Sequence, residues 1–412
     1  MGRFGLLGEK LSHSFSPFIH NLLGSYEYKL YEKQPDELDE FFHNANFDGL
    51  NVTIPYKKEV IKYCQSLSEA ARITGNVNTI TRQPDDTFHG DNTDLFGFNY
   101  LLKKAGVNIS GAKAIILGSG GSSLTVQAVL HNADNMKAKE IIVISRTGNN
   151  NYENISKHYD AEIIINTTPV GMYPSNGNSP LGDLKMFKNC RAVVDLIYNP
   201  AKTEFLMRAE DLGIPCANGL AMLVAQAKKA AEHFTNAGID DEKTEEIISK
   251  IIKKTRNIIL IGMPGCGKTS IGQALANKTG REFADTDDRI TRTSGKSIPA
   301  IFAEDGEEAF RNMETDALKS LCKQSGLIIA TGGGIVTRPE NQRLIRQNGI
   351  VIYLNRDVSQ LPVSGRPLSE REGANKLAAV RLPLYEKWRD LKIKVSGIGI
   401  EQAAEEICNK LF

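Results

Sequence analysis

Two glycine-rich turns, each directly after a short apolar run, constrain this chain most. The run Lys113–Leu117 leads into the turn GSGGSS, and the run Asn257–Ile261 leads into GMPGCGKTS. Glycine-rich turns that bind phosphate follow a strand and open a helix, so each turn marks the core of its own nucleotide-binding sheet. Short β-type runs alternate with helical patterns along the chain, which predicts an α/β protein with mostly parallel sheets.

A helical pattern between the two turns predicts the boundary of two halves. A chain of 412 residues exceeds what one hydrophobic core usually supports. Acidic residues open the pattern at Asp240, Asp241 and Glu242, and Lys253 and Lys254 close it, as the helix macrodipole favours. We therefore expect a terminal helix of the first half to run almost directly into the first strand of the second.

Charge and cysteine content exclude several classes of protein. The formal net charge of +1 gives no electrostatic case for nucleic acid or an anionic membrane as the main partner. The 6 cysteines include no CxxC pair, so we expect neither a zinc site nor a disulfide framework. No signal-peptide pattern and no apolar run of roughly 20 residues occurs. We expect a cytoplasmic protein that acts on small molecules, and its oligomeric state stays open.

The first turn by itself is a weak dinucleotide-binding signal. Gly118, Gly120 and Gly121 let a backbone turn approach a pyrophosphate, but Ser123 stands where the usual fingerprint has a third glycine. The next predicted strand, Glu140–Ile144, ends close to Arg146. An arginine there suits the 2′-phosphate of NADP, and a solvated surface arginine is an equal alternative.

Polar residues upstream of this turn have both structural and chemical interpretations. Ser16 before Pro17 is typical of a helix N-cap, and Ser14 beside it adds a second hydroxyl that together with Ser16 could hold a carboxylate. Lys57 lies just beyond a short strand broken by Pro55, and an isolated lysine is typical of a surface charge. Spacing alone favours Asp94 as the cap of the helix that follows.

The second turn is a strong signal. Residues 262–269 read G-x-x-x-x-G-K-T between a strand and a helical pattern, which predicts a P-loop. Its backbone N–H groups would enclose ATP phosphates, with Lys268 on the β- and γ-phosphate oxygens and Thr269 on Mg²⁺. We expect Asp285 and Asp287 to alternate at the end of a strand and so to project to the same side. Cys266 reads as a small residue that fits the loop.

The first half resembles the shikimate dehydrogenases. SHSFSPFIHN, NVTIPYK, GNVNTI, GDNTDLFGF, GSGGSS, NTTPVGMYP, DLIYNP and GLAMLVAQA occur in that family's order over nearly all of residues 1–235. The resemblance implies reduction of 3-dehydroshikimate to shikimate with NADPH, and Lys57 and Asp94 as the catalytic pair. It further implies that the substrate contacts Ser14, Ser16, Thr53, Asn78, Asp94, Tyr198 and Gln226, and that the cofactor contacts Gly118, Ser119, Gly120, Gly121, Ser122, Arg146, Gly219 and Met222.

The second half resembles the shikimate kinases. FADTDDRI, IFAEDGEEAFRNME, ATGGGIV, GRPLSE and RLPLYEKW follow the P-loop in that family's order over roughly 257–412. The resemblance implies phosphorylation of shikimate, with Asp287 on the attacking hydroxyl, Asp285 and Thr269 for Mg²⁺, and Lys268 and Arg366 as further catalytic residues. The implied ATP contacts are Gly262, Pro264, Gly265, Cys266, Gly267, Lys268, Thr269 and Ser270, and the implied shikimate contacts are Asp287, Arg311, Gly332, Gly333, Gly334 and Arg381.

These resemblances divide the chain into four parts. We expect a substrate lobe over 1–100, a Rossmann-like NADP lobe over 101–220, closing helices over 221–254 and a P-loop kinase over 255–412. The segment after Arg146 is short and polar for a crossover, and the kinase lid region is shorter than in many relatives. Phe302 and Phe310 could line the ring pocket or pack in a core.

Two other functions stay open on the sequence. The first half could be a quinate or quinate/shikimate dehydrogenase that uses NAD. Alternatively, one of the two sites could be catalytically silent and serve in binding or regulation.

Overall fold

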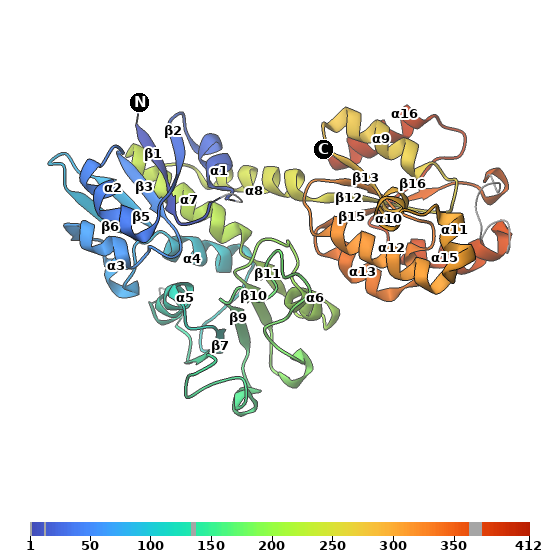
Figure 1. Cartoon of the computed structure of the whole chain (residues 1–412). Coiled ribbons are helices and arrows are strands. Elements are labelled where there is room, and N and C mark those ends of the chain that lie inside the picture. Colours follow the sequence, from blue (N-terminus) through green and yellow to red (C-terminus); the bar gives the residue numbers. More distant parts are fainter. Residues whose placement is uncertain (1, 12–13, 133–136, 362–372) are drawn as a thin grey trace. The chain divides into compact units, whose positions relative to one another are not determined.

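The computed structural model describes residues 2–11, 14–132, 137–361 and 373–412, which form two compact units (Figure 1). The first unit contains Met1–Met172, Asn178–Asn199 and Arg208–Ser249, and the second contains Tyr173–Gly177, Pro200–Met207 and Lys250–Phe412. The fold is α/β, with two sheets in the first unit and one in the second, as predicted. Within the described ranges no helix combines the length and apolar character of a membrane span.

A mixed sheet of six strands, in the order β2-β1-β3-β5-β6-β4, opens the first unit. β1 pairs in parallel with β2 and β3, whereas β5 runs antiparallel to β3 and β6. Its strands are β1 (Arg3–Gly8), β2 (Glu27–Glu32), β3 (Gly49–Val52), β4 (Ser66–Leu67), β5 (Thr79–Arg82) and β6 (Phe88–Asp91). The accompanying helices are α1 (Ser16–Leu23), α2 (Leu38–Asn44), α3 (Glu69–Thr74) and α4 (Asp94–Lys104).

The register of this sheet decides which loops meet. Thr79 at the start of β5 lies opposite Asn51 of β3 and opposite Asp91 at the end of β6. The loop after β3, the loop before β5 and the loop after β6 therefore reach the same edge of the sheet. Lys57, Asn78 and Asp94 lie in or directly after these three loops.

The second sheet has five parallel strands in the order β11-β10-β9-β7-β8. They are β7 (Lys113–Leu117), β8 (Glu140–Ile144), β9 (Ile163–Asn166), β10 (Ala192–Asp195) and β11 (Cys216–Asn218), with helices α5 (Gly121–Asn132) and α6 (Glu204–Asp211). The connection from β8 to β9, which is described throughout, contains the 3-10 turn Ile155–His158 and no α-helix. Its short polar sequence predicts this reduced crossover.

Two helices return from the second sheet to the first. α7 (Leu220–Thr235) packs on α4 and α1, and α4 also contacts α5. Phe234 near the end of α7 stacks on Phe4 of β1, with ring centroids 4.6 Å apart. α8 (Asp241–Thr255) follows, and its Ile247, Ile248 and Ile251 are buried, as its apolar stripe predicts. The division between the two units falls within α8.

The second unit is built on five parallel strands in the order β13-β14-β12-β15-β16. The central β12 is buried along its whole length, as expected for a parallel strand covered on both faces. The strands are β12 (Asn257–Ile261), β13 (Phe283–Asp285), β14 (Ile328–Ala330), β15 (Gly349–Asn355) and β16 (Leu391–Lys394). The helices are α9 (Lys268–Thr279), α10 (Thr286–Ser294), α11 (Ile298–Glu304), α12 (Gly306–Cys322), α13 (Pro339–Arg346), α15 (Ala374–Trp388) and α16 (Ile400–Leu411).

Candidate active sites

A cavity of about 600 Å³ lies in the first unit, between residues of its two sheets. It gathers most of the polar residues singled out in the first half. The predicted residues that line it are Ser14, Ser16, Thr53, Lys57, Asn78, Asp94, Ser122, Tyr198, Gly219, Met222 and Gln226. They come from loops and helix ends spread over more than half of the chain, so only the fold brings them together.

Lys57 and Asp94 form the charged centre of this cavity. Lys57 Nζ donates to Asp94 Oδ2 at 2.6 Å, and Asn78 Nδ2 donates to Asp94 Oδ1 at 2.9 Å. The Asp94 side chain is 11% exposed and that of Lys57 is 23% exposed, so the pair is partly shielded yet reachable. A cation held beside a cavity in this way can stabilise and protonate an oxygen that becomes negative there.

The interpretation of Asp94 as a helix cap is wrong. Asp94 is the first residue of α4, and the N-cap position is Thr93, whose side chain makes no cap hydrogen bond. Asn92 Oδ1 instead accepts from the Asp94 backbone N–H at 3.0 Å. The Asp94 carboxylate is thereby left to Lys57 and Asn78.

The capping interpretation of Ser16 is also wrong. α1 begins at Ser16 and its N-cap residue is Phe15, because Pro17 takes the second helical position. Ser14 Oγ accepts from the Ser16 backbone N–H at 3.2 Å. Both hydroxyls line the cavity.

The first glycine-rich turn joins β7 to α5, as predicted. Gly118 adopts a φ of +103°, and a Cβ there would lie 2.8 Å from Thr167 Oγ1, so this position requires glycine. Gly121 opens α5, and Ser119 and Gly120 lie in the turn before it. Arg146 is exposed just after β8, which pairs directly with β7. Its side chain therefore starts from the same sheet edge as the turn.

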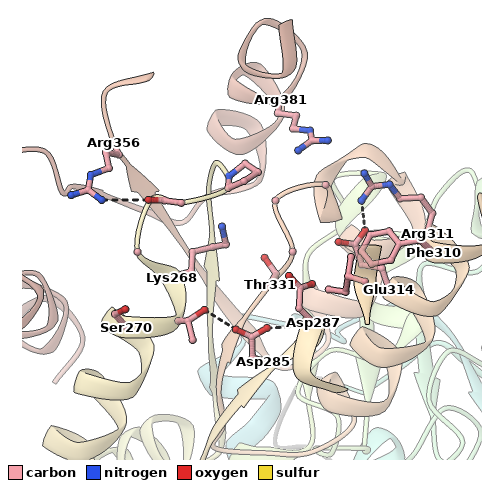
Figure 2. Close-up of a pocket in the computed structure, with 18 of the residues that line it drawn as sticks. Lys268, Ser270, Asp285, Asp287, Phe310, Arg311, Glu314, Thr331, Arg356 and Arg381 are labelled. Carbon is pink, nitrogen blue, oxygen red and sulfur yellow. Dashed lines mark hydrogen bonds and ion pairs between the residues drawn. The ribbon is translucent and has the colours of Figure 1, made fainter. Parts of the chain in front are cut away.

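The second unit contains a cavity of about 610 Å³ at the carboxyl edge of its sheet (Figure 2). Three neighbouring strands, β12, β13 and β14, lead directly into segments that line it. The predicted residues in the lining are Pro264, Gly265, Gly267, Lys268, Thr269, Ser270, Asp285, Asp287, Arg311, Gly332, Gly333, Gly334 and Arg381. Gly262 and Cys266 belong to the loop without lining the cavity, and Arg366 lies outside the described residues.

Lys268 bonds to its own loop. Its Nζ donates to the carbonyl oxygens of Gly262 at 2.9 Å and Met263 at 3.0 Å. Thr269 Oγ1 donates to Asp285 Oδ2 at 2.8 Å. A hydroxyl and a carboxylate side by side form the kind of oxygen pair that Mg²⁺ uses together with phosphate oxygens.

Asp285 and Asp287 do not alternate on a strand, contrary to the prediction. β13 ends at Asp285, which becomes the N-cap of α10, and Asp287 lies in the first turn of that helix. Asp285 Oδ1 accepts from the Asp287 backbone N–H at 2.9 Å. Both carboxylates still line the cavity, because the helix turn brings Asp287 back to it (Figure 2).

Asp287 is the most perturbed carboxyl group of this cavity. Burial, followed by the negative charges of Asp285 and Glu314, raises its pKa to about 7. Its Oδ1 has no hydrogen-bond partner among the described residues. Burial also raises the pKa of Glu314, against the opposing effect of Arg311. A carboxyl group with a pKa near neutrality is suited to accept a proton from a reacting hydroxyl.

Arg311 is held by an ion pair with Glu314 across one turn of α12. Its NH1 donates to Glu314 Oε2 at 2.7 Å, and the guanidinium is buried. The glycine run packs against these groups: a Cβ at Gly332 would lie 2.2 Å from Glu314 Oε1, and one at Gly334 would lie 1.9 Å from Arg311 NH1. This run is therefore a closely packed wall of the cavity.

Several residues of the cavity linings were not predicted from the sequence, among them Asn51 and Arg356. Asn51 lines the first cavity although it belongs to the buried strand β3, and Arg356 lines the second after the end of β15. A polar residue inside an apolar strand was the available signal for Asn51. Phe302 and Phe310 both line the second cavity, and their rings pack together with centroids 4.6 Å apart.

Known proteins resemble each half of the chain. A family model described as the shikimate dehydrogenase substrate binding domain matches residues 6–80, and one described as shikimate kinase matches residues 264–412. Shikimate dehydrogenase (NADP(+)) of Clostridium perfringens (strain 13 / Type A) is 36% identical over 272 residues, which cover 61% of this chain and 98% of that protein.

Solved structures give the same result for the first half of the chain. A chorismate mutase/shikimate 5-dehydrogenase fusion protein from Clostridium acetobutylicum is 38% identical with a TM-score of 0.56, over 60% of this chain and 96% of that one. Shikimate 5-dehydrogenase from Thermus thermophilus, in complex with NADP(H) and shikimate, is 29% identical with a TM-score of 0.55, over 61% and 99%. The chain therefore belongs to the shikimate dehydrogenase family and carries a shikimate kinase domain in the same polypeptide.

Proposed function

We propose that this chain catalyses two consecutive reactions, the NADPH-dependent reduction of 3-dehydroshikimate to shikimate and the ATP-dependent phosphorylation of shikimate to shikimate 3-phosphate. The carrying observation is that one chain holds two cavities of similar size, each with the charged groups that its reaction needs. We assign the substrate lobe to 1–100, the NADP lobe to 101–220, the closing helices to 221–254 and the kinase to 255–412.

In the first cavity Lys57 and Asp94 act as the catalytic pair. NADPH supplies the hydride when bound. Addition of hydride to the ketone carbon leaves an alkoxide, to which the Lys57 ammonium donates a proton. Asp94 orients that ammonium through the 2.6 Å contact and balances its charge. In the reverse direction the neutral lysine accepts the hydroxyl proton.

The remaining polar groups of this cavity bind and orient the ring. Ser14 and Ser16 hold the substrate carboxylate, and the ring contacts Thr53, Asn78, Tyr198 and Gln226. The turn 118–122, Gly219 and Met222 would hold the cofactor. A Cβ at Gly219 would lie 1.9 Å from the Leu196 carbonyl oxygen, so the backbone is closely packed at this point. Arg146 binds the 2′-phosphate through a charge-assisted contact.

In the second cavity the P-loop binds the ATP phosphates, and Lys268 exchanges its loop carbonyls for the β- and γ-phosphate oxygens. The Thr269 hydroxyl and the Asp285 carboxylate would hold Mg²⁺, which would neutralise phosphate charge. Asp287 accepts the proton of the attacking shikimate hydroxyl as the new O–P bond forms and ADP leaves. Arg311 and Arg381 bind the shikimate carboxylate, since guanidinium groups form bidentate contacts with carboxylates.

One assay of the whole chain tests both reactions. Purified protein receives 3-dehydroshikimate, NADPH and Mg-ATP, and NADPH oxidation and ADP release are followed separately. We expect ADP to appear after NADPH oxidation begins, and to appear without NADPH oxidation when shikimate is added directly. Binding of either nucleotide without its turnover would contradict the proposal for that half.

A further inference from the structure

We infer that Thr79 is a positioning residue of the dehydrogenase site, which sets the orientation of the buried Asn51 amide, supports that of the Asn78 amide and through them holds the geometry of the Lys57–Asp94 pair. This inference rests on the role proposed above for that pair. Thr79 is 1% exposed and lies behind the cavity lining, at the first position of β5.

The polarity of the hydrogen bonds around Thr79 follows from one donor that cannot be reversed. The backbone N–H of Thr93 donates to Asn78 Oδ1 at 2.8 Å. This contact fixes the Asn78 side-chain amide, so its Nδ2 faces Asp94, whose Oδ1 accepts at 2.9 Å. An ionised carboxylate can only accept, which agrees with this orientation.

The Thr79 hydroxyl continues the series of hydrogen bonds from Asn78 to Asn51. It donates to Asn78 Oδ1 at 3.0 Å and also lies 3.3 Å from Thr93 Oγ1. Its oxygen lone pairs then accept from Asn51 Nδ2 at 3.3 Å. This fixes the Asn51 amide too, and its Oδ1 accepts from the Tyr28 hydroxyl at 2.8 Å.

The result is a head-to-tail series of hydrogen bonds that ends on Asp94. It runs from Tyr28 through Asn51, Thr79 and Asn78 to the carboxylate, which Lys57 approaches from the other side. Aligned hydrogen bonds in a low-dielectric interior strengthen one another.

Thr79 connects Asn51 to Asn78 in this series because its hydroxyl both donates and accepts. Asn51 and Asn78 line the cavity, and each could present either its oxygen or its nitrogen there if its amide rotated. The Thr79 hydroxyl removes that freedom for Asn51 and supports the fixed orientation of Asn78. A side chain of the same shape without a hydroxyl would leave the Asn51 amide nitrogen without its Thr79 acceptor and the Asn51 amide free to turn. Asn78 Oδ1, in contrast, would keep its Thr93 donors.

The test compares Thr79→Val, which keeps the shape and removes the hydroxyl, with Thr79→Ser, which keeps the hydroxyl and removes a methyl group. Thr81→Val is the matched control, since Thr81 lies on the same strand and its Oγ1 accepts from Gln83 instead. We expect Thr79→Val to lower kcat/KM for 3-dehydroshikimate about tenfold, as the loss of one buried hydrogen bond does. Thr79→Ser and Thr81→Val should stay within about twofold of the parent.

Further readouts separate positioning from a folding defect. The KM for NADPH should stay unchanged in all three variants, and the deuterium isotope effect on kcat with labelled NADPH should rise in Thr79→Val alone. A smaller folded fraction would lower kcat without changing the isotope effect. Thermal unfolding should show that Thr79→Val and Thr79→Ser are both folded at the assay temperature.

Asp94→Asn is measured alongside to separate the role of Thr79 from the role of the Lys57–Asp94 pair. If Asp94→Asn is strongly impaired while Thr79→Val keeps its kcat/KM within about twofold, the positioning role is wrong and the catalytic pair stands. If Thr79→Ser is as impaired as Thr79→Val, shape rather than the hydroxyl matters and the inference is likewise wrong. If Asp94→Asn retains full turnover, the proposed pair is wrong, and the role of Thr79 with it.

Discussion

The two cavities hold their charges in opposite ways. In the first, Lys57 and Asp94 pair at 2.6 Å, and buried amides and hydroxyls surround them. In the second, Asp285, Asp287 and Glu314 crowd together, and Lys268 bonds to carbonyl oxygens of its own loop. The reactions proposed for them account for this difference. Reduction of a ketone creates one negative oxygen, which a resident cation can meet, whereas phosphoryl transfer brings in a polyanion with its own metal ion.

The largest expected effect is a loss of dehydrogenase activity in the first cavity, with the second cavity unaffected. Lys57→Ala removes both the proton donor and the cation that stabilises the alkoxide, so dehydrogenase kcat should fall by about 10³–10⁴-fold. Kinase kcat, measured with shikimate and Mg-ATP, should stay unchanged. The adjacent exposed residue gives the control Lys58→Ala, which should retain both activities. A dehydrogenase loss below about tenfold would remove Lys57 from this role.

The next largest expected effect is a loss of kinase activity in the second cavity, with the first cavity unaffected. Asp287→Asn removes the group that accepts the hydroxyl proton, so kinase kcat should fall by about 10²-fold with the dehydrogenase unaffected. Because the pKa of Asp287 is about 7, the deprotonated fraction rises through that pH, and kcat/KM for shikimate in the parent should rise with it. Asp288→Asn at the exposed neighbouring position is the control. A kcat/KM that stays flat from pH 6 to 8 would contradict this assignment.

A smaller effect is expected on NADPH binding when one exposed cation of the first unit, Arg146, is removed. Arg146→Ala should weaken NADPH binding by roughly 1.5–3 kcal/mol and leave NADH binding unchanged, because only the 2′-phosphate contact is lost. The dissociation constants of both cofactors, from fluorescence titration, measure this. Arg191→Ala, at another exposed arginine of the same unit, serves as the control. If Arg146→Ala binds both cofactors as the parent does, the phosphate contact lies elsewhere.

The smallest effect concerns stability, and the two units should respond to acid in opposite directions. Burial lowers the pKa of His20, behind the first cavity, from 6.5 to about 3. The unfolded chain therefore binds more protons below pH 6.5, and this contribution to stability is lost as pH falls from about 6.5 toward 3. Asp287 has a raised pKa, so its contribution is present at low pH and is lost as pH rises through about 7.

From pH 7 to pH 5.5 the free energy of unfolding of the first unit should fall by about 1 kcal/mol through His20, and that of the second should rise by about 1–2 kcal/mol through Asp287. Trp388, the only tryptophan of the chain, is buried in α15, so its fluorescence reports unfolding of the second unit. Loss of dehydrogenase activity reports the first. His20→Gln should reduce the acid loss, and His43→Gln at an exposed position should not. A decrease of equal size in both units would contradict this contrast.

Local sequence was sufficient to predict strands, turns and helices wherever neighbouring residues determine the backbone conformation. The strand, turn and helix around 113–132 and 257–279 form as predicted, because glycines allow the turns and apolar runs fill parallel strands. The helix at Asp241–Thr255 and the ion pair of Arg311 with Glu314 follow from spacing within one helix. The order of motifs identified both families.

Tertiary structure decided what each polar side chain does. Ser16 and Asp94 have sequences suited to capping, yet neither caps its helix, because neighbouring loops take other positions. Asp287 reaches its cavity from a helix turn. Asn51 and Thr79 lie within the motifs NVTIPYK and GNVNTI, but no role was predicted for them or for Arg356. Their roles depend on partners remote in sequence: Lys57 meets Asp94 across 37 positions, and Asn51 meets Thr79 across 28. A side chain's hydrogen-bond partner is the nearest suitable group in space, and only the pairing of strands and packing of helices determines which group that is.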